Sequence, residues 1–255
     1  FGHAAHLRGH GQWPGHDARD ELHPHLQHFL HGLCTKAKVP YQTVAQGQEH
    51  QQGAFLLLGK KVLRPGLHPI SPPKALDSNI VELRVEALGL VPDILVNNAG
   101  LSTLGPVHAA DVTGELNMIE VDVVAVAELC TRFLPGMVAR GRGAVLNVAS
   151  TAAFQPLPGQ AGYGACKAFV LSYTRSLAGE LAGTGVAATA LCPGPVDTGF
   201  GEAAGFSKED AESALPSFMW ESTENVARCG VDALAKGHPV AIPGAANRVA
   251  AMVAH

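Results

Sequence analysis

The stretch DILVNNAG, residues 93–100, decides the fold. It is a short apolar run that ends in turn residues, which is the form of a buried strand in a parallel sheet. Two later stretches have the same form, GAVLNVAS at 143–150 and GVAATALCPGP at 185–195. Apolar residues at helical spacing fill the intervals between them, at 111–139 and 160–182. From about residue 90 the chain therefore alternates buried strands with amphipathic helices.

This alternation continues toward the C-terminus. Residues 222–236 have helical spacing, and PVAIPG at 239–244 has the composition of a last strand. Continuous apolar strands separated by helices indicate a sheet that is covered on both faces. We therefore expect an α/β fold, namely a Rossmann-like doubly wound parallel sheet in three layers, α/β/α. In such sheets ligands bind at the carboxyl ends of the strands, where Asn97, Ser150 and the 193–198 loop fall.

Composition narrows the class of protein. The chain has 255 residues, of which 47% are hydrophobic and 16% charged, so we expect one globular domain with a buried core. The formal charge of −4 gives no reason to expect nucleic acid as a partner, and no apolar run is long enough to span a membrane. The cysteines are odd in number and never spaced as CxxC, and no signal-peptide pattern opens the chain. We therefore expect free thiols and a cytoplasmic protein.

Histidines offer a competing interpretation, in which the N-terminal part binds a metal. His25, His28 and His31 would bring two imidazoles onto one face of a helix. They have no acidic or cysteine partner at ligand spacing, so we expect solvated histidines and no metal site.

The stretch STAAFQPLPGQAGYGACK, residues 150–167, carries the candidate chemistry. Tyr163 and Lys167 are four residues apart on a predicted helix and so share a face. A free tyrosine has a pKa of about 10, and a nearby ammonium favours the phenolate form that general acid–base catalysis at neutral pH requires. The hydroxyl of Ser150 could hold the oxygen atom that exchanges the proton. Taken alone, however, a tyrosine and a lysine at this spacing are more often neighbours on a solvated helix face.

Four motifs in order change that balance. Ser150, Tyr163 with Lys167, the NNAG turn at 97–100 and PGPVDTGF at 193–200 together resemble the short-chain dehydrogenase/reductase family. The resemblance covers about residues 90–255 and implies an NAD(P)-dependent oxidoreductase that acts on a secondary alcohol or ketone. Within one domain over residues 1–255, it makes 91–255 the well-matched catalytic part and leaves 1–90 as a divergent part.

The resemblance also implies a role for individual residues. Tyr163 would be the acid–base, Ser150 would orient the substrate oxygen, and Lys167 would bind the nicotinamide ribose and favour the phenolate. The cofactor-binding positions would be Asn97, Ala99, Gly100, Tyr163, Lys167, Pro193, Gly194, Val196 and Thr198. Residues 199–220 would cover the substrate, and candidate walls of its pocket are Phe154, Leu157, Phe200 and Trp220. For each of these four, ordinary packing is an equally good explanation.

The chain departs from the family pattern in two places. Asp122 stands 28 residues before Ser150, where the family usually has an asparagine that holds a water in its proton relay. A carboxylate there could hold a water or attract Lys167, so we include Asp122 among the catalytic residues. The family's N-terminal glycine turn is the second departure, since Gly11 and Gly15 match it only by chance and Asp17 replaces the third glycine.

These departures leave an alternative open, a catalytically impaired or non-catalytic member that binds a nucleotide or serves as a scaffold. Without the glycine turn, the choice between NAD and NADP rests on resemblance, which slightly favours NADP. The resemblance further implies a homodimer or homotetramer that pairs through helices 111–139 and 160–182. The moderately apolar cover over the site suggests a hydrophobic small-molecule substrate.

Overall fold

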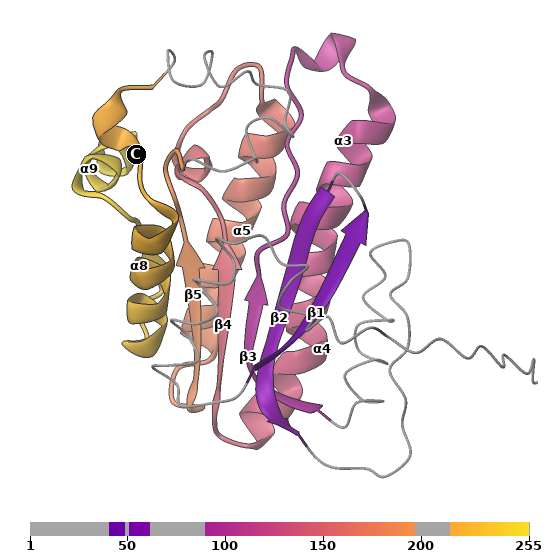
Figure 1. Cartoon of the computed structure of the whole chain (residues 1–255), viewed down its shortest axis with the longest axis vertical. Coiled ribbons are helices and arrows are strands. Elements are labelled where there is room, and N and C mark those ends of the chain that lie inside the picture. The colour runs from indigo at the N-terminus through magenta and orange to yellow at the C-terminus, as the bar shows by residue number, and fades with distance from the viewer. Residues whose placement is uncertain (1–40, 49–50, 62–89, 197–214, 255) are drawn as a thin grey trace, which may run out of the picture.

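A computed structural model describes residues 41–48, 51–61, 90–196 and 215–254 (Figure 1). Several expectations fall outside these ranges: the glycine turn near Gly11, the histidines near His28, and the positions Thr198 and Phe200.

The described strands form one sheet of six, in the order β1-β2-β3-β4-β5-β6. Their bounds are β1 Tyr41–Gln48, β2 Gln51–Lys61, β3 Leu90–Asn97, β4 Gly143–Val148, β5 Val186–Leu191 and β6 Val240–Ala241. Strands β3, β4, β5 and β6 are parallel neighbours, which confirms the parallel sheet expected from residue 90 onward.

The two N-terminal strands run differently. β1 pairs with β2, and β2 with β3, in the antiparallel sense, so the sheet is mixed where the sequence suggested parallel strands throughout. For β1 and β2 the physical reason lies in the connection between them. Only residues 49–50 separate these strands, whereas a parallel pair needs a crossover of about a dozen residues.

The predicted helix at 111–139 is one long helix with an irregular centre. It comprises α3 Val112–Ile119, a π-helical segment Glu120–Val124 and α4 Ala125–Ala139. Asp111 caps its first turn by accepting a 2.8 Å hydrogen bond from the Gly114 amide. In the π segment, the Ala125 amide donates to the Glu120 carbonyl, one residue further back than in an α-helix.

The remaining helices complete three layers. They are α5 Ala161–Glu180, α8 Thr223–Ala235 and α9 Ala245–Val253, with short 3-10 turns at Val107–Ala109 (η1), Thr151–Phe154 (η3) and Ser217–Met219 (η4). Because side chains alternate along a strand, Leu95 packs with α4 and α5 on one face, while Val96 packs with α8 on the other. Figure 1 shows β1 and β2 at one side of the sheet and α8 and α9 at the other. In the described part of the chain, no helix combines the length and apolar character needed to cross a bilayer.

Candidate active site

Three parallel strands deliver their carboxyl ends to one edge of the sheet. β3, β4 and β5 are in register there, since Asn97 pairs with Asn147 and Val148 with Leu191. The loops that follow β4 and β5 also stay side by side, because the Thr151 amide donates a 2.8 Å hydrogen bond to the Pro193 carbonyl. The NNAG turn, the Ser150 loop and the 193–196 turn therefore meet at one place, as the sequence led us to expect.

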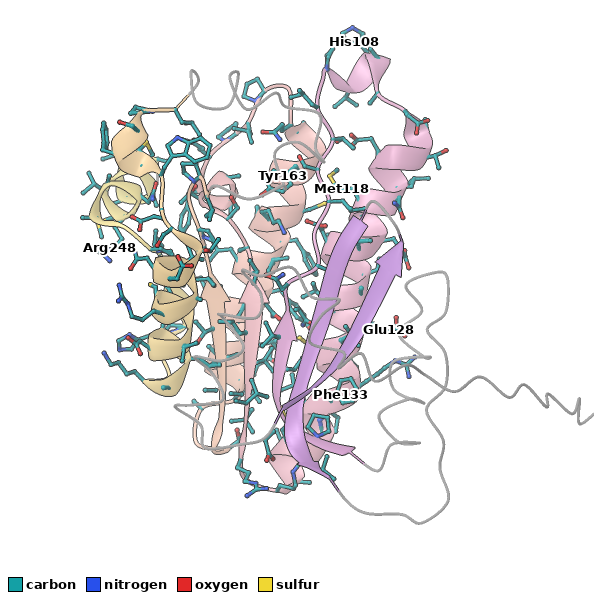
Figure 2. All side chains as sticks on the ribbon, viewed as in Figure 1. His108, Met118, Glu128, Phe133, Tyr163 and Arg248 are labelled. Carbon is teal, nitrogen blue, oxygen red and sulfur yellow. The ribbon has the colours of Figure 1, made fainter. Side chains whose placement is uncertain are left out.

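Tyr163 and Lys167 enter this place from the first two turns of α5. The Lys167 ammonium lies 5.6 Å from the centre of the Tyr163 ring and donates to the Val148 carbonyl at 3.3 Å. Only 4% of Lys167 is exposed, so the helix face that carries the pair is turned into the protein. The methyl group of Met118 on α3 packs against Gly162, the residue before Tyr163, and Figure 2 labels both Met118 and Tyr163.

Asp122 is bound directly to Lys167. The two side chains form an ion pair with 2.9 Å between Nζ and Oδ2, and the other oxygen, Oδ1, accepts a 2.7 Å hydrogen bond from the Leu101 amide. Asp122 is fully buried, whereas Asn117, one turn earlier, is exposed. Because Asp122 lies within the π segment, the extra residue of that turn contributes to the direction of its carboxylate.

The electrostatic consequence falls on Lys167. Burial of the ammonium by itself would lower its pKa, but attraction by Asp122, aided by Tyr163, outweighs burial and raises the pKa above the ordinary value of 10.5. Lys167 is therefore a permanently charged group beside Tyr163. Its charge is opposed at close range by that of Asp122.

Ser150 is held by its own loop. It is the N-cap of η3, where its oxygen accepts a 3.1 Å hydrogen bond from the Ala152 amide, and its hydroxyl faces the Pro193 carbonyl at 3.5 Å. These contacts tie the hydroxyl to the 193–196 turn at the end of β5.

Asn97 points inward. It is 1% exposed and donates to the Asn147 amide oxygen at 2.7 Å, and Asn147 in turn donates to the Thr174 hydroxyl on α5 at 2.9 Å. The first residue of the NNAG turn thus braces β3 and β4 against α5. Ala99 packs in the core beneath the turn, and Gly100 adjoins Lys167, so near that an added methyl group would lie 3.1 Å from Nζ.

The candidate pocket walls are not equally placed. Leu157 lies over the first turn of α5, against Gly164. Phe154 is half-buried and packs on the core cluster around Val170, whereas the Trp220 indole donates to the Leu215 carbonyl at 3.4 Å. The 193–196 turn is connected to the Trp220 region through Val196, which pairs with Glu221.

The loop at 101–106 forms part of the same surroundings, although none of its residues was among the predicted site residues. Gln160 donates to the Ser102 hydroxyl at 2.9 Å, and the Gly105 amide donates to the Gly159 carbonyl at 2.8 Å. The Thr103 hydroxyl also donates to the Glu115 carboxylate. No motif marks these residues, and their only sequence signal is that they directly follow the NNAG turn. Among the described residues, no cluster of histidine, cysteine, aspartate or glutamate side chains could hold a metal ion.

Comparison with known proteins identifies the family. Residues 77–208 match the short chain dehydrogenase family, and the chain belongs to it. It is 35% identical over 159 residues to the NADP-dependent 3-hydroxy acid dehydrogenase YdfG of Salmonella typhi, covering 61% of this chain and 63% of that protein. It is 36% identical over 117 residues to the 2-(R)-hydroxypropyl-CoM dehydrogenase of Xanthobacter autotrophicus, covering 45% of this chain and 46% of that protein. The chain thus spans less than two thirds of the length of these curated relatives.

The fold is also similar to that of a solved member of this family. A short-chain dehydrogenase from Sphingobium yanoikuyae, solved in complex with NADPH, superposes with a TM-score of 0.60 at 28% identity, over 69% of this chain and 67% of that one.

Proposed function

We propose that this chain is an NADP-dependent oxidoreductase that transfers a hydride between the nicotinamide cofactor and a secondary alcohol or ketone. The observation that carries the proposal is a charged, buried Lys167 beside Tyr163, at the sheet edge where Ser150 also lies. Base and orienting hydroxyl come from different elements that the parallel strands bring together, which is the arrangement that general acid–base catalysis needs. The relatives described above are dehydrogenases of hydroxy compounds, in agreement with this chemistry.

Each residue then has a specific task. Tyr163 passes a proton to or from the substrate oxygen, and the Ser150 hydroxyl holds that oxygen by a hydrogen bond. Lys167 stabilises the negative charge that develops on the Tyr163 oxygen, because unlike charges at this distance attract strongly in a partly buried site. Asp122 fixes the position of Lys167 and moderates its field.

The described residues suit the nicotinamide end of the cofactor. The Lys167 ammonium offers hydrogen-bond donors to ribose hydroxyls, and the turns at 97–100 and 193–196 offer backbone groups beside it. When bound there, the cofactor supplies or accepts the hydride. We favour NADP over NAD because a relative and a similar solved structure carry NADP or NADPH in their names.

We also propose that two copies pair through α4 and α5. The outer surface between these helices has a groove of about 510 Å³. Its lining is mostly apolar and includes one charged side chain, that of Glu180, together with Thr131, Leu134, Pro135, Val138, Tyr173, Ser176, Leu177, Leu181 and Thr184. Nearby, Phe169 stacks on Tyr173 with 5.4 Å between ring centres, although Phe169 is itself 37% exposed. An apolar face of this kind suits a second copy of the chain, and sedimentation velocity would reveal the dimer.

Cofactor binding is the first test of the proposed function. We expect NADPH to bind with a micromolar dissociation constant and to raise the melting temperature, and NADH to bind more weakly. Tyr163→Phe should keep this binding and lose turnover of secondary alcohols, because it removes only the proton-transfer group. The proposal would be refuted if neither NADPH nor NADH bound to the protein.

A further inference from the structure

The C-terminal helix α9 contains a buried polar side chain that the catalytic scheme above does not use. Asn247 lies in the first turn of α9 and has no exposed surface. Its amide nitrogen donates a 2.9 Å hydrogen bond to the Met219 carbonyl at the end of η4. Figure 2 marks the next residue, Arg248, at the edge of the molecule where α9 lies.

The amide group of Asn247 also packs directly against the 193–196 turn. A methyl group added to Gly194 would lie 2.5 Å from Asn247 Cγ and 2.6 Å from Nδ2, so the backbone of the turn rests on this amide. A side chain larger than hydrogen at residue 194 would therefore displace either the turn or α9. The helix also contacts η3, the turn that follows Ser150.

The turn is connected to both sides of the site. Its Pro193 carbonyl accepts the Thr151 amide at 2.8 Å, next to Ser150, and its Pro195 carbonyl accepts the Glu221 amide at 3.0 Å. Met219, which Asn247 binds, stands two residues before Glu221. Asn247 therefore holds the turn and the segment that pairs with it at the same time.

The oxygen of Asn247 shows that simple packing is a poor explanation for this residue. Within the described residues, the buried Oδ1 accepts no hydrogen bond. An unpaired buried acceptor costs free energy that an apolar side chain would avoid. The benefit that offsets this cost is the donor that the same side chain directs at Met219.

We propose that Asn247 is a positioning residue, which holds the 193–196 turn against the Ser150 loop and so sets the geometry of the nicotinamide end of the site. The positioning is a property of this chain, and its consequence for the cofactor rests on the proposed function. Asn247 acts through Gly194 and Met219 and has no contact with reacting atoms in this scheme.

Hydrogen exchange tests the positioning without any need for activity. In Asn247→Leu, which keeps the branched side-chain skeleton and removes the donor, we expect the Thr151 and Glu221 amides to exchange roughly fivefold faster, the effect of losing one ordinary hydrogen bond. Amides in the centre of β4, such as that of Leu146, should keep their rates. Ala251→Gly is the matched control, because Ala251 is buried on the same face of α9 and has no side-chain group that could donate to the Met219 carbonyl.

Two outcomes would overturn the proposal: unchanged exchange at Thr151 and Glu221 in Asn247→Leu, or an equal increase in Ala251→Gly. The dissociation constant of NADPH is a second measurement. We expect several-fold weaker binding in Asn247→Leu and near-normal binding in Ala251→Gly. If the unmodified protein binds no cofactor, the proposed function fails, while the exchange rates still decide whether Asn247 positions the turn.

Discussion

Replacing Asp122 by asparagine should move the pH dependence of the reaction toward acid. Lys167 Nζ lies 5.6 Å from the Tyr163 ring centre and 2.9 Å from Asp122 Oδ2, so the carboxylate is at most about 8.5 Å from the ring. At an effective dielectric constant of about 20, a unit charge at that distance contributes about 2 kcal/mol, or about 1.4 pH units. Asp122→Asn removes this negative charge from the surroundings of Tyr163, which favours the phenolate at every pH where Lys167 stays charged.

The assay is the pH profile of kcat/KM for NADP-linked oxidation of a secondary alcohol between pH 5 and 10. We expect the apparent pKa of the rising limb to fall by about one unit or more in Asp122→Asn. Glu120→Gln is the matched control, because Glu120 is an exposed acid in the same π segment and its loss should leave the profile unchanged. A profile for Asp122→Asn that superimposes on that of the unmodified protein would refute the electrostatic role of Asp122.

Folding stability should respond in the same variant with a definite pH dependence. The Lys167 pKa is raised in the folded protein, so the stability it contributes is fully present below the ordinary value of 10.5 and is lost only as pH rises through the higher folded value. In Asp122→Asn burial acts on Lys167 without the opposing carboxylate and lowers its pKa, so we expect a loss of about 3–5 kcal/mol of unfolding free energy near neutral pH, which becomes smaller as pH rises toward 10.5. Urea unfolding at several pH values measures this difference.

Three further substitutions or treatments test how the site is supported. Gly162→Ala should destabilise the fold by about 1–3 kcal/mol and slow turnover, because the new methyl group would lie 2.6 Å from Met118 Cε and also against the Glu115 carboxylate. Gly179→Ala is the control: this glycine faces open space on the same helix, so the change should be neutral or stabilising. Thr174→Val should cost about 1–3 kcal/mol in chemical unfolding, because the buried Asn147 amide loses its oxygen acceptor and keeps only the weak contact to the Cys130 sulfur; Ser176→Ala, an exposed hydroxyl on the same helix, should cost less than about 0.5 kcal/mol. Burial raises the pKa of Cys130 and Cys192 to about 12 and that of Cys166 to about 11, so iodoacetamide at pH 8 should leave all three unmodified until the protein is unfolded, as peptide mass spectrometry would show.

Periodicity carried most of the fold because buried strands and amphipathic helices leave a local trace. The strand expected at 143–150 is found at Gly143–Val148, and the helix expected at 160–182 at Ala161–Glu180. Strand direction leaves no such trace. The run AFLLL at 54–58 has the composition of a strand and lies within β2, but its antiparallel pairing with β1 depends on the short connection between these two strands.

The candidate site was predictable to the extent that its residues occur in ordered motifs. The ion pair between Asp122 and Lys167 was one of two interpretations that the sequence left open, because the direction of a side chain on a helix depends on the local turn. The spacing of apolar residues at 111–139 predicts a helix, but it gives no sign of the π segment at the centre of that helix. Asn247 has no motif at all, and its significance depends on two segments, at 194 and 219, that come near it only in the folded chain.

Buried polar groups show where this fold gives up stability for geometry. In the described part of the chain the fully buried polar side chains are Asn97, Asp122, Asn147, Lys167, Thr174, Thr189 and Asn247. All but Thr189 belong to three sets: the Asn97 network, the Asp122 ion pair and the clamp of Asn247. Each set joins a turn at the carboxyl edge of the sheet to a helix, so their cost in desolvation is concentrated around one site. Apolar residues of similar volume would serve the core equally well, but only directional hydrogen bonds hold a turn in one orientation.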